Sequence, residues 1–172
     1  MPNGINYGDY LYWNTKVAPS TWAVGDTNIN IGGFAGNTNQ QSFAVALGYQ
    51  AGQNTQGNNT IAIGTGAGQY NQTNRGIAIG LYAARTSQLQ EAIGIGYGAG
   101  GGFQGRDSVA IGVLAGNETQ GAYAIAVGYL AGEYRQNQNT IAIGYYAGSS
   151  YQGSGAIAIG YQAASSTQST GG

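Results

Sequence analysis

The chain of 172 residues contains no cysteine and no histidine, and charged residues make up only 6% of it. The absence of cysteine excludes disulfide bonds and thiol catalysis. The absence of both residue types excludes the usual zinc sites and any Ser-His or Cys-His pair. A net charge of −1, with only five Lys and Arg residues, provides no basic patch for nucleic acid or for an acidic membrane surface. The composition therefore predicts a protein that has no cofactor, no metal site and no nucleic-acid partner.

Export and membrane signals are also missing from the sequence. The first residues, MPNGINYGDY, have neither the basic region nor the apolar region of a secretory signal. Apolar stretches such as TIAIGYYAG at 140–148 are far shorter than the roughly 20 residues needed to cross a bilayer. We therefore expect no membrane insertion.

Glycine is abundant, with 33 residues, and one glycine recurs at a fixed interval. It falls at Gly32 and then at every sixteenth residue up to Gly160, which makes nine copies without insertion or deletion. The residues three and one before this glycine are always Ile, Val or Leu, and the residue between them is small in eight copies. Large-small-large alternation predicts a short strand, and the polar half of each repeat predicts a second strand and a turn. The sequence therefore predicts an all-β fold, a parallel β-roll or β-solenoid of nine 16-residue coils.

The repeat divides the chain into two parts. Residues 1–27 break the period and form an N-terminal capping or docking segment, while residues 28–172 form the repeat domain. The segment GDYLYWNTKVAPSTWAVG reads as two short strands joined by a Pro-Ser turn. Its aromatic residues could cap the first coil or dock onto another component, and the sequence leaves both roles open. The residues that we assign to this role are Tyr10, Tyr12, Trp13 and Trp22.

The strand pattern predicts which side chains fill the roll. Large aliphatic side chains are expected to point inward, where each would contribute roughly 1.5–3 kcal/mol of burial energy. The expected core ladder comprises Ile61, Ile63, Ile77, Ile79, Ile141, Ile143, Ile157 and Ile159. The small residues between the aliphatic ones would then face outward and allow sister molecules to approach. The expected subunit interface comprises Ala46, Ala62, Ala78, Ala110, Ala126, Ala142 and Ala158.

Two further columns recur in phase with the repeat. Glutamine stands eight residues after the repeat glycine in all nine copies and predicts a ladder of side-chain amides. The amide ladder includes Gln56, Gln72, Gln88, Gln104, Gln120, Gln136 and Gln152. Tyrosine directly follows the repeat glycine in five copies and predicts either a stabilising ladder or a surface for a partner. These tyrosines are Tyr49, Tyr97, Tyr129, Tyr145 and Tyr161.

A family resemblance is visible in three copies of the repeat. They are SVAIGVLAG at 108–116, TIAIGTGAG at 60–68 and AIAIGYQAA at 156–164. They resemble the head repeats of trimeric autotransporter adhesins, which also occur in phage and viral fibres, and the likeness covers residues 28–168. The resemblance implies a left-handed parallel β-roll, packed side by side in a homotrimer. It also implies an extracellular location, on a cell surface or a virion.

The sequence and the resemblance together favour a non-enzymatic structural or adhesive protein, the head or a segment of a trimeric surface fibre. Its partners would be two sister chains and a host-surface protein or glycan. The alternative is an extracellular filament subunit that assembles head to tail, and a glycan-binding or glycan-cleaving solenoid is a third reading. The six carboxylates show no facing pair of the kind a glycosidase requires. Glu91 and Asp107 share a column with Arg75, which predicts a solvated charge column with partial pairing.

Overall fold

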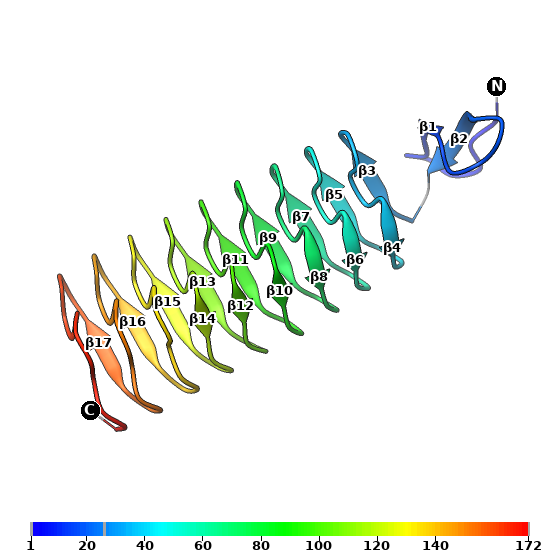
Figure 1. Cartoon of the computed structure of the whole chain (residues 1–172). Helices are drawn as coiled ribbons and strands as arrows, with labels where there is room; N and C mark the ends of the chain where they lie inside the picture. The colour runs from blue at the N-terminus through cyan, green and yellow to red at the C-terminus, as the bar shows by residue number, and fades with distance from the viewer. Residues whose placement is uncertain (1, 26, 172) are drawn as a thin grey trace.

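The computed structural model describes residues 2–25 and 27–171, and it is built from β-strands and turns. Residues 1, 26 and 172, which belong to the two predicted segments, lie outside this description. Successive coils stack along one axis into an elongated roll, with the N-terminal strand pair beyond one end (Figure 1). Among the described residues there is no helix, and hence none that could cross a bilayer. The predicted all-β parallel solenoid is confirmed.

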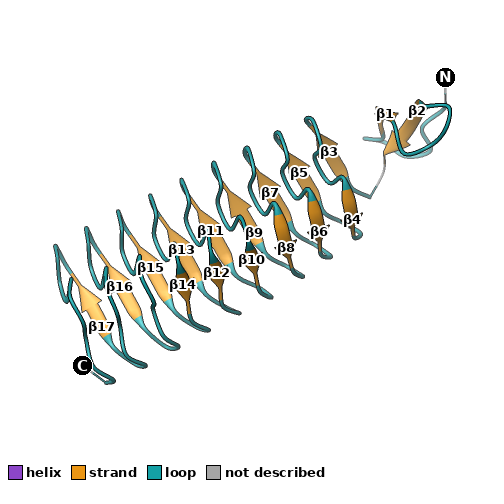
Figure 2. Cartoon of the chain, viewed as in Figure 1, coloured by secondary structure: helices purple, strands orange, loops and turns teal. Residues whose placement is uncertain are grey.

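The aliphatic half of each repeat forms one strand of a nine-stranded sheet (Figure 2). Each strand pairs in parallel with the strand one coil away, so that every residue lies beside its counterpart 16 positions along the chain, as Ile93 lies beside Val109. The strands are β3 (Ile29–Ile31), β5 (Val45–Leu47), β7 (Ile61–Ile63), β9 (Ile77–Ile79), β11 (Ile93–Ile95), β13 (Val109–Ile111), β15 (Ile125–Val127), β16 (Ile141–Ile143) and β17 (Ile157–Ile159).

The polar half of each repeat forms a second, shorter parallel sheet of six strands. These strands are β4 (Thr38–Gln40), β6 (Asn54–Gln56), β8 (Tyr70–Gln72), β10 (Ser87–Gln88), β12 (Phe103–Gln104) and β14 (Thr119–Gln120). Single bridges between Gln120 and Gln136, between Gln136 and Gln152, and between Gln152 and Gln168 continue the pairing to the last coil. Every coil therefore keeps the same register on both of its sides.

Glycine makes the corner between the strands. At Gly80 the backbone has a φ of +127°, and a β-carbon there would lie 2.6 Å from the carbonyl oxygen of Gly96 in the next coil. Both the dihedral angle and the close approach exclude a side chain. This explains why the repeat glycine occurs in all nine copies.

The interior of the roll is narrow, and alanine and glutamine fill it. In the seven aliphatic strands with a central alanine that alanine is buried, and so is Gly94 in β11, whereas Asn30 in β3 is half-buried. The glutamines on the opposite side of the interior are buried from Gln56 to Gln152. The glutamine side chain crosses the interior and donates from Nε2 to the carbonyl oxygen of the first residue of the aliphatic strand, as in Gln72 to Ile61 at 2.9 Å. Equivalent bonds from Gln56 to Gln168 span 2.5 to 3.3 Å.

The predicted core ladder is wrong, because the aliphatic side chains lie on the outside of the roll. Alternation along β9 buries Ala78 completely and leaves the flanking isoleucines partly exposed. The space between the two sheets holds an alanine and a crossing glutamine, so it cannot hold two isoleucines. The residues that were predicted to lie inside but lie on the outer surface are Ile61, Ile63, Ile77, Ile79, Ile141, Ile143, Ile157 and Ile159.

The predicted subunit interface through alanine is wrong for the same reason. These alanines pack inside their own chain and are at most 2% exposed, so no second molecule can reach them. The residues concerned are Ala46, Ala62, Ala78, Ala110, Ala126, Ala142 and Ala158.

The glutamine ladder is present, and it lies inside the roll. Nε2 of Gln88 donates to Oε1 of Gln104 at 3.1 Å, and the same bond joins Gln72 to Gln88, Gln136 to Gln152 and Gln152 to Gln168. The ladder is interrupted at Gln72, Gln120 and Gln136, whose Oε1 atoms are buried without a hydrogen-bond partner. Because each glutamine also bonds across the interior, this column joins the two sheets as well as neighbouring coils.

The N-terminal segment forms the expected strand pair, β1 (Tyr10–Asn14) and β2 (Thr21–Gly25), which is antiparallel. The hydroxyl group of Tyr10 donates to the carbonyl oxygen of Asn28 at 2.7 Å and accepts from the backbone N–H of Asn30 at 2.9 Å. These two bonds satisfy polar groups of the first coil that no preceding coil can reach. Tyr10 therefore caps the first coil, which is one of the two roles that the sequence left open.

Candidate functional site

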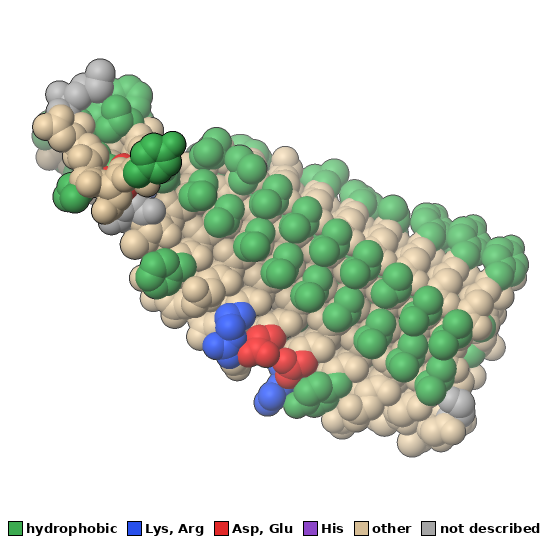
Figure 3. Space-filling view, turned by 180° about the vertical axis from the view of Figure 1, so that it is seen from behind, with side chains coloured by type: hydrophobic (Ala, Val, Ile, Leu, Met, Phe, Trp, Pro, Cys, Tyr) green, Lys and Arg blue, Asp and Glu red, His purple; other side chains and the backbone are tan. Residues whose placement is uncertain are grey.

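The outer surface of the nine-stranded sheet, which we call the aliphatic face, is an exposed apolar surface that repeats in every coil. It consists of the two outward side chains of each of the nine strands, and Figure 3 shows them as continuous apolar rows along the roll. All of these side chains are at least partly exposed. The most exposed ones range from 37% at Ile143 to 63% at Ile159. The rows run for about 40 Å at the spacing of paired strands. A soluble protein rarely leaves so regular an apolar surface without a partner.

Charged side chains lie at one margin of the aliphatic face (Figure 3). Arg75 donates from Nε to Oε1 of Glu91 at 2.8 Å, one coil along the roll. Arg106 bonds Oδ2 of Asp107 at 3.0 Å, and its guanidinium group lies over the ring of Tyr123. The solvated charge column predicted for this position is confirmed, and each acid there has a basic partner.

The tyrosine column lies on the surface as predicted, next to the corner glycine. Its exposed fractions run from 43% at Tyr129 to 74% at Tyr161. The rings of Tyr129, Tyr145 and Tyr161 stack, with centroids 5.2 and 5.4 Å apart and interplanar angles of 13° and 5°. In these three coils the tyrosines contact one another, so the column at least stabilises the roll.

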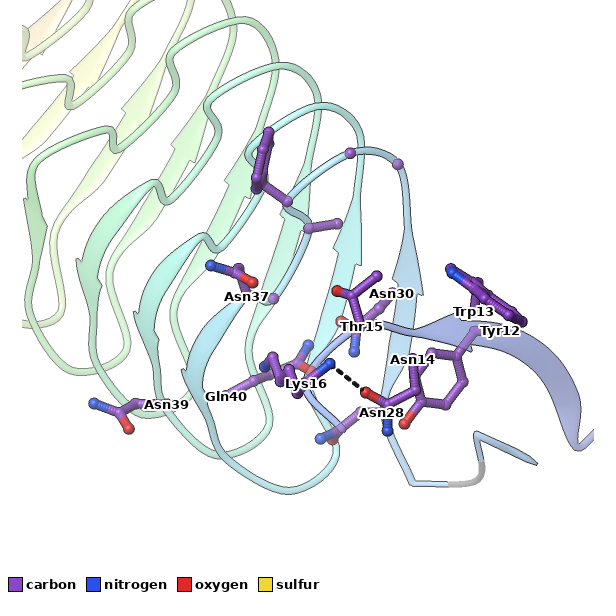
Figure 4. A pocket seen from close by; sticks show the side chains of 15 residues that line it. Tyr12, Trp13, Asn14, Thr15, Lys16, Asn28, Asn30, Asn37, Asn39 and Gln40 are labelled. Carbon is purple, nitrogen blue, oxygen red and sulfur yellow. Dashed lines mark hydrogen bonds between the residues drawn. The ribbon is translucent and has the colours of Figure 1, made fainter. Parts of the chain in front are cut away.

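A cavity of about 730 Å³ separates the N-terminal strand pair from the first coil (Figure 4). Trp13 and Tyr12 line it from the strand pair, and amide side chains such as Asn28, Asn30 and Gln40 line it from the coil. The backbone N–H of Lys16 donates to Oδ1 of Asn14 at 2.9 Å and orders the turn above the cavity. The Oδ1 atom of Asn30 is buried without a partner, so it faces protein rather than an open binding surface.

The aromatic residues assigned to capping or docking divide between two roles. Tyr10 bonds to the first coil, whereas Trp13 and Trp22 face each other across the strand pair with ring centroids 5.5 Å apart. About half of each indole remains exposed, at 53% and 51%. The rings of Tyr12 and Tyr10 are tilted by 43° to each other, with centroids 6.2 Å apart. The tryptophan pair is thus free to contact another molecule.

Most of the described acidic side chains lie in two places: the charge column with Glu91 and Asp107, and the adjacent coils that carry Glu118 and Glu133. No group of three or more acidic, cysteine or histidine side chains suited to a metal ion occurs in residues 2–25 and 27–171. Glu118 and Glu133 lie on adjacent coils, and burial raises the pKa of the Glu133 carboxyl, with a further contribution from the Glu118 charge. Glu118 is exposed to solvent.

Sequence reasoning missed the aliphatic face because a period of two identifies two faces of a strand without saying which is inside. The available signal was the glutamine present in every repeat, since a long polar side chain that crosses the interior leaves room only for alanine opposite it.

No known family model, curated protein or solved structure matches the chain.

Proposed function

We propose that the protein is a non-enzymatic structural module, one segment of a trimeric surface fibre in which three rolls pack side by side. The observation that carries the proposal is the aliphatic face, which runs the length of the roll without a partner. Burying each exposed aliphatic side chain would contribute about 25 cal/mol per Å² of apolar area. A face of this regularity favours association with a surface of the same repeat.

A second copy of the chain is the partner that best fits this face. Its apolar rows recur at the strand spacing, so copies aligned in parallel would place row against row along the whole roll. No charged side chain lies within the two aliphatic columns, and the four charged residues at the margin already pair within the chain. The three-fold arrangement and the extracellular location rest on the resemblance of the repeats to adhesin heads.

Head-to-tail filament formation fits less well, because the strand pair occupies the N-terminal end of the roll. Tyr10 holds it there through two hydrogen bonds, so stacking through this end would have to displace it. Sedimentation equilibrium tests the proposal against this alternative. A discrete species of three chains of 17.5 kDa supports the fibre segment, and a monomer or an open-ended series of sizes refutes it.

A further inference from the structure

One coil of the roll lacks three of the outward side chains that its neighbours carry. At the corner between the two sheets, Gly98, Gly101 and Gly102 stand where the preceding coil has Tyr82, Arg85 and Thr86 and the following coil has Leu114, Asn117 and Glu118. The result is a notch of about 530 Å³. It is lined by Tyr82, Arg85, Thr86, Tyr97, Gly98, Gly101, Gly102, Leu114, Asn117, Glu118 and Thr119. We call it the glycine notch.

The backbone does not require glycine at two of these positions. Gly98 has a φ of 61°, but Tyr82 and Leu114 adopt 57° and 54° at the same point of the repeat with full side chains. Gly101 is not in the left-handed region, and a β-carbon there would lie 2.8 Å from the movable amide of Asn117 and 3.0 Å from the carbonyl oxygen of Gly98, a tight but tolerable approach. The missing side chains at these positions therefore create space that the fold itself does not demand.

Hydrogen bonds between coils occupy the backbone on the floor of the glycine notch. The carbonyl oxygens of Gly101 and Gly102 accept from Thr86 and Ser87, both at 3.1 Å. The N–H of Gly102 donates to the carbonyl oxygen of Asn117 at 2.6 Å. An extended peptide that binds by strand addition needs free backbone groups, and this floor offers none. A ligand here would be recognised by side chains.

The walls carry one cation and one anion that the protein leaves unpaired. Arg85 lies over the ring of Tyr82 at 4.8 Å and donates from Nε to Oε1 of Gln69 at 3.0 Å. Within the described residues, neither Arg85 nor Glu118 takes part in an ion pair. Tyr97, 48% exposed, adds an aromatic ring at the margin. The notch thus combines opposite charges that balance, an amide, hydroxyl groups and aromatic surface.

We propose that the glycine notch binds a short neutral oligosaccharide. A sugar ring has an apolar face that packs on tyrosine and hydroxyl groups that both donate and accept. Hydrogen bonds from hydroxyl groups to Arg85 and Glu118 would be strengthened by the charges, and a neutral ligand suits their balance. The volume lies within the usual range for ligand pockets. None of the lining residues belongs to the nine-stranded sheet, so the proposal stands whether or not the rolls associate.

Amide TROSY spectra of the full ¹⁵N-labelled chain test this site. Cellotriose, maltotriose, mannotriose and tri-N-acetylchitotriose are each added up to about 10 mM, a range that detects weak binding. At least one sugar should shift the amide signals of residues 82–86, 97–102 and 114–119 in a saturable way. No saturable shift with any of the four sugars, or shifts confined to other coils, would overturn the proposal.

Three variants in the notch and one control variant outside it assign the binding to side chains of the notch. Tyr97→Ala and Arg85→Gln should each weaken the sugar by about tenfold or more, whereas Tyr49→Ala, in the same tyrosine column but three coils away, should not. Gly101→Asn, which restores a side chain common in that column, should fill the notch and block binding. Retained signal dispersion shows that each variant is folded. Equal losses in Tyr97→Ala and Tyr49→Ala would contradict the assignment.

Discussion

The side chain of Gln88 donates from Nε2 to the carbonyl oxygen of Ile77 at 2.7 Å, across the interior of the roll. The same nitrogen lies 2.7 Å from the carbonyl oxygen of Ala92 and 3.1 Å from Oε1 of Gln104. One amide therefore connects the two sheets and the next coil. Its length sets the width of the interior, and this width places alanine inside and isoleucine outside.

Replacement of Gln88 tests this role directly. Gln88→Leu should lower the free energy of unfolding by about 1–3 kcal/mol, because the acceptors of its three bonds lose their donor. Gln88→Glu should cost more at neutral pH, since an ionised carboxylate would face two carbonyl oxygens, and should recover in part in acid, where the protonated group can donate. Urea unfolding followed by circular dichroism measures both, with exposed Gln90→Glu as the control. Equal losses in Gln88→Glu and Gln90→Glu would contradict the role.

Enlarging an inward alanine should destabilise the single chain. Ala126 is fully buried, so Ala126→Leu should reduce the stability by about 1–3 kcal/mol or more through overpacking. Ile125→Leu, one residue away on the outward side of β15, should cost much less. Thermal unfolding of the two variants makes the comparison. Similar melting temperatures would mean that the two faces of the strand are not distinguished by packing.

The sequence alone was sufficient to predict the architecture of the repeat domain. The exact spacing of the repeat glycine and the alternation in Ile93, Gly94 and Ile95 define parallel coils in register, because the same positions must pair in every coil. The N-terminal strand pair and the charge column at Arg75 and Glu91 also follow from the residues.

The sequence did not predict which side chains of the aliphatic strands face the interior, because this depends on the side chains of the opposite sheet. Hydrophobicity alone favours isoleucine inside, but Gln104 extends from β12 to the carbonyl oxygen of Ile93 and occupies that space. The glycine notch was invisible for a similar reason. It arises because three columns have glycine in the same coil, and only the structure shows that these columns share a corner.

Substitution should destabilise the roll at a corner glycine but not at a loop glycine. Gly80→Ala should destabilise the roll by about 3 kcal/mol, since its β-carbon would collide with Gly96 and its φ is unsuited to a side chain. Gly155 has a φ of +75° with open space around it, and Asn59 and Asn139 occupy the equivalent position at 57° and 60°. Gly155→Asn should therefore be neutral. Chemical denaturation of both variants provides the test, and a tolerated Gly80→Ala would contradict the corner geometry.

Polar substitution on the aliphatic face should dissociate the assembly without unfolding it. The double variant Ile79→Ser, Ile95→Ser removes apolar surface from the centre of the face but leaves the interior intact. Light scattering after size exclusion should show the mass of a single chain. Tyr70→Ser, an exposed change on the opposite sheet, should leave the trimer unchanged. A trimer that survives the double variant would exclude this face as the interface.

The Glu133 carboxyl should make the stability of the protein fall as the pH rises. Burial raises its pKa in the folded state above the unfolded value, so the folded protein binds this proton more tightly. The stability contribution is then present at low pH and is lost between the unfolded and folded pKa values. Glu133→Gln should melt at the same temperature as the natural chain near pH 3.5, where the carboxyl is largely protonated, and above it at about pH 7.

Glu118 supplies the control for this pH effect, because its charge is the second cause of the shift. Glu118→Gln should reduce the pH dependence of the melting temperature in the natural chain. The same change should have little effect on it when Glu133 is already glutamine. A double-mutant cycle of melting temperatures at the two pH values measures both effects. If Glu133→Gln instead melted below the natural chain at neutral pH, the carboxylate would be stabilising the fold. Burial would then not be the dominant influence on this group.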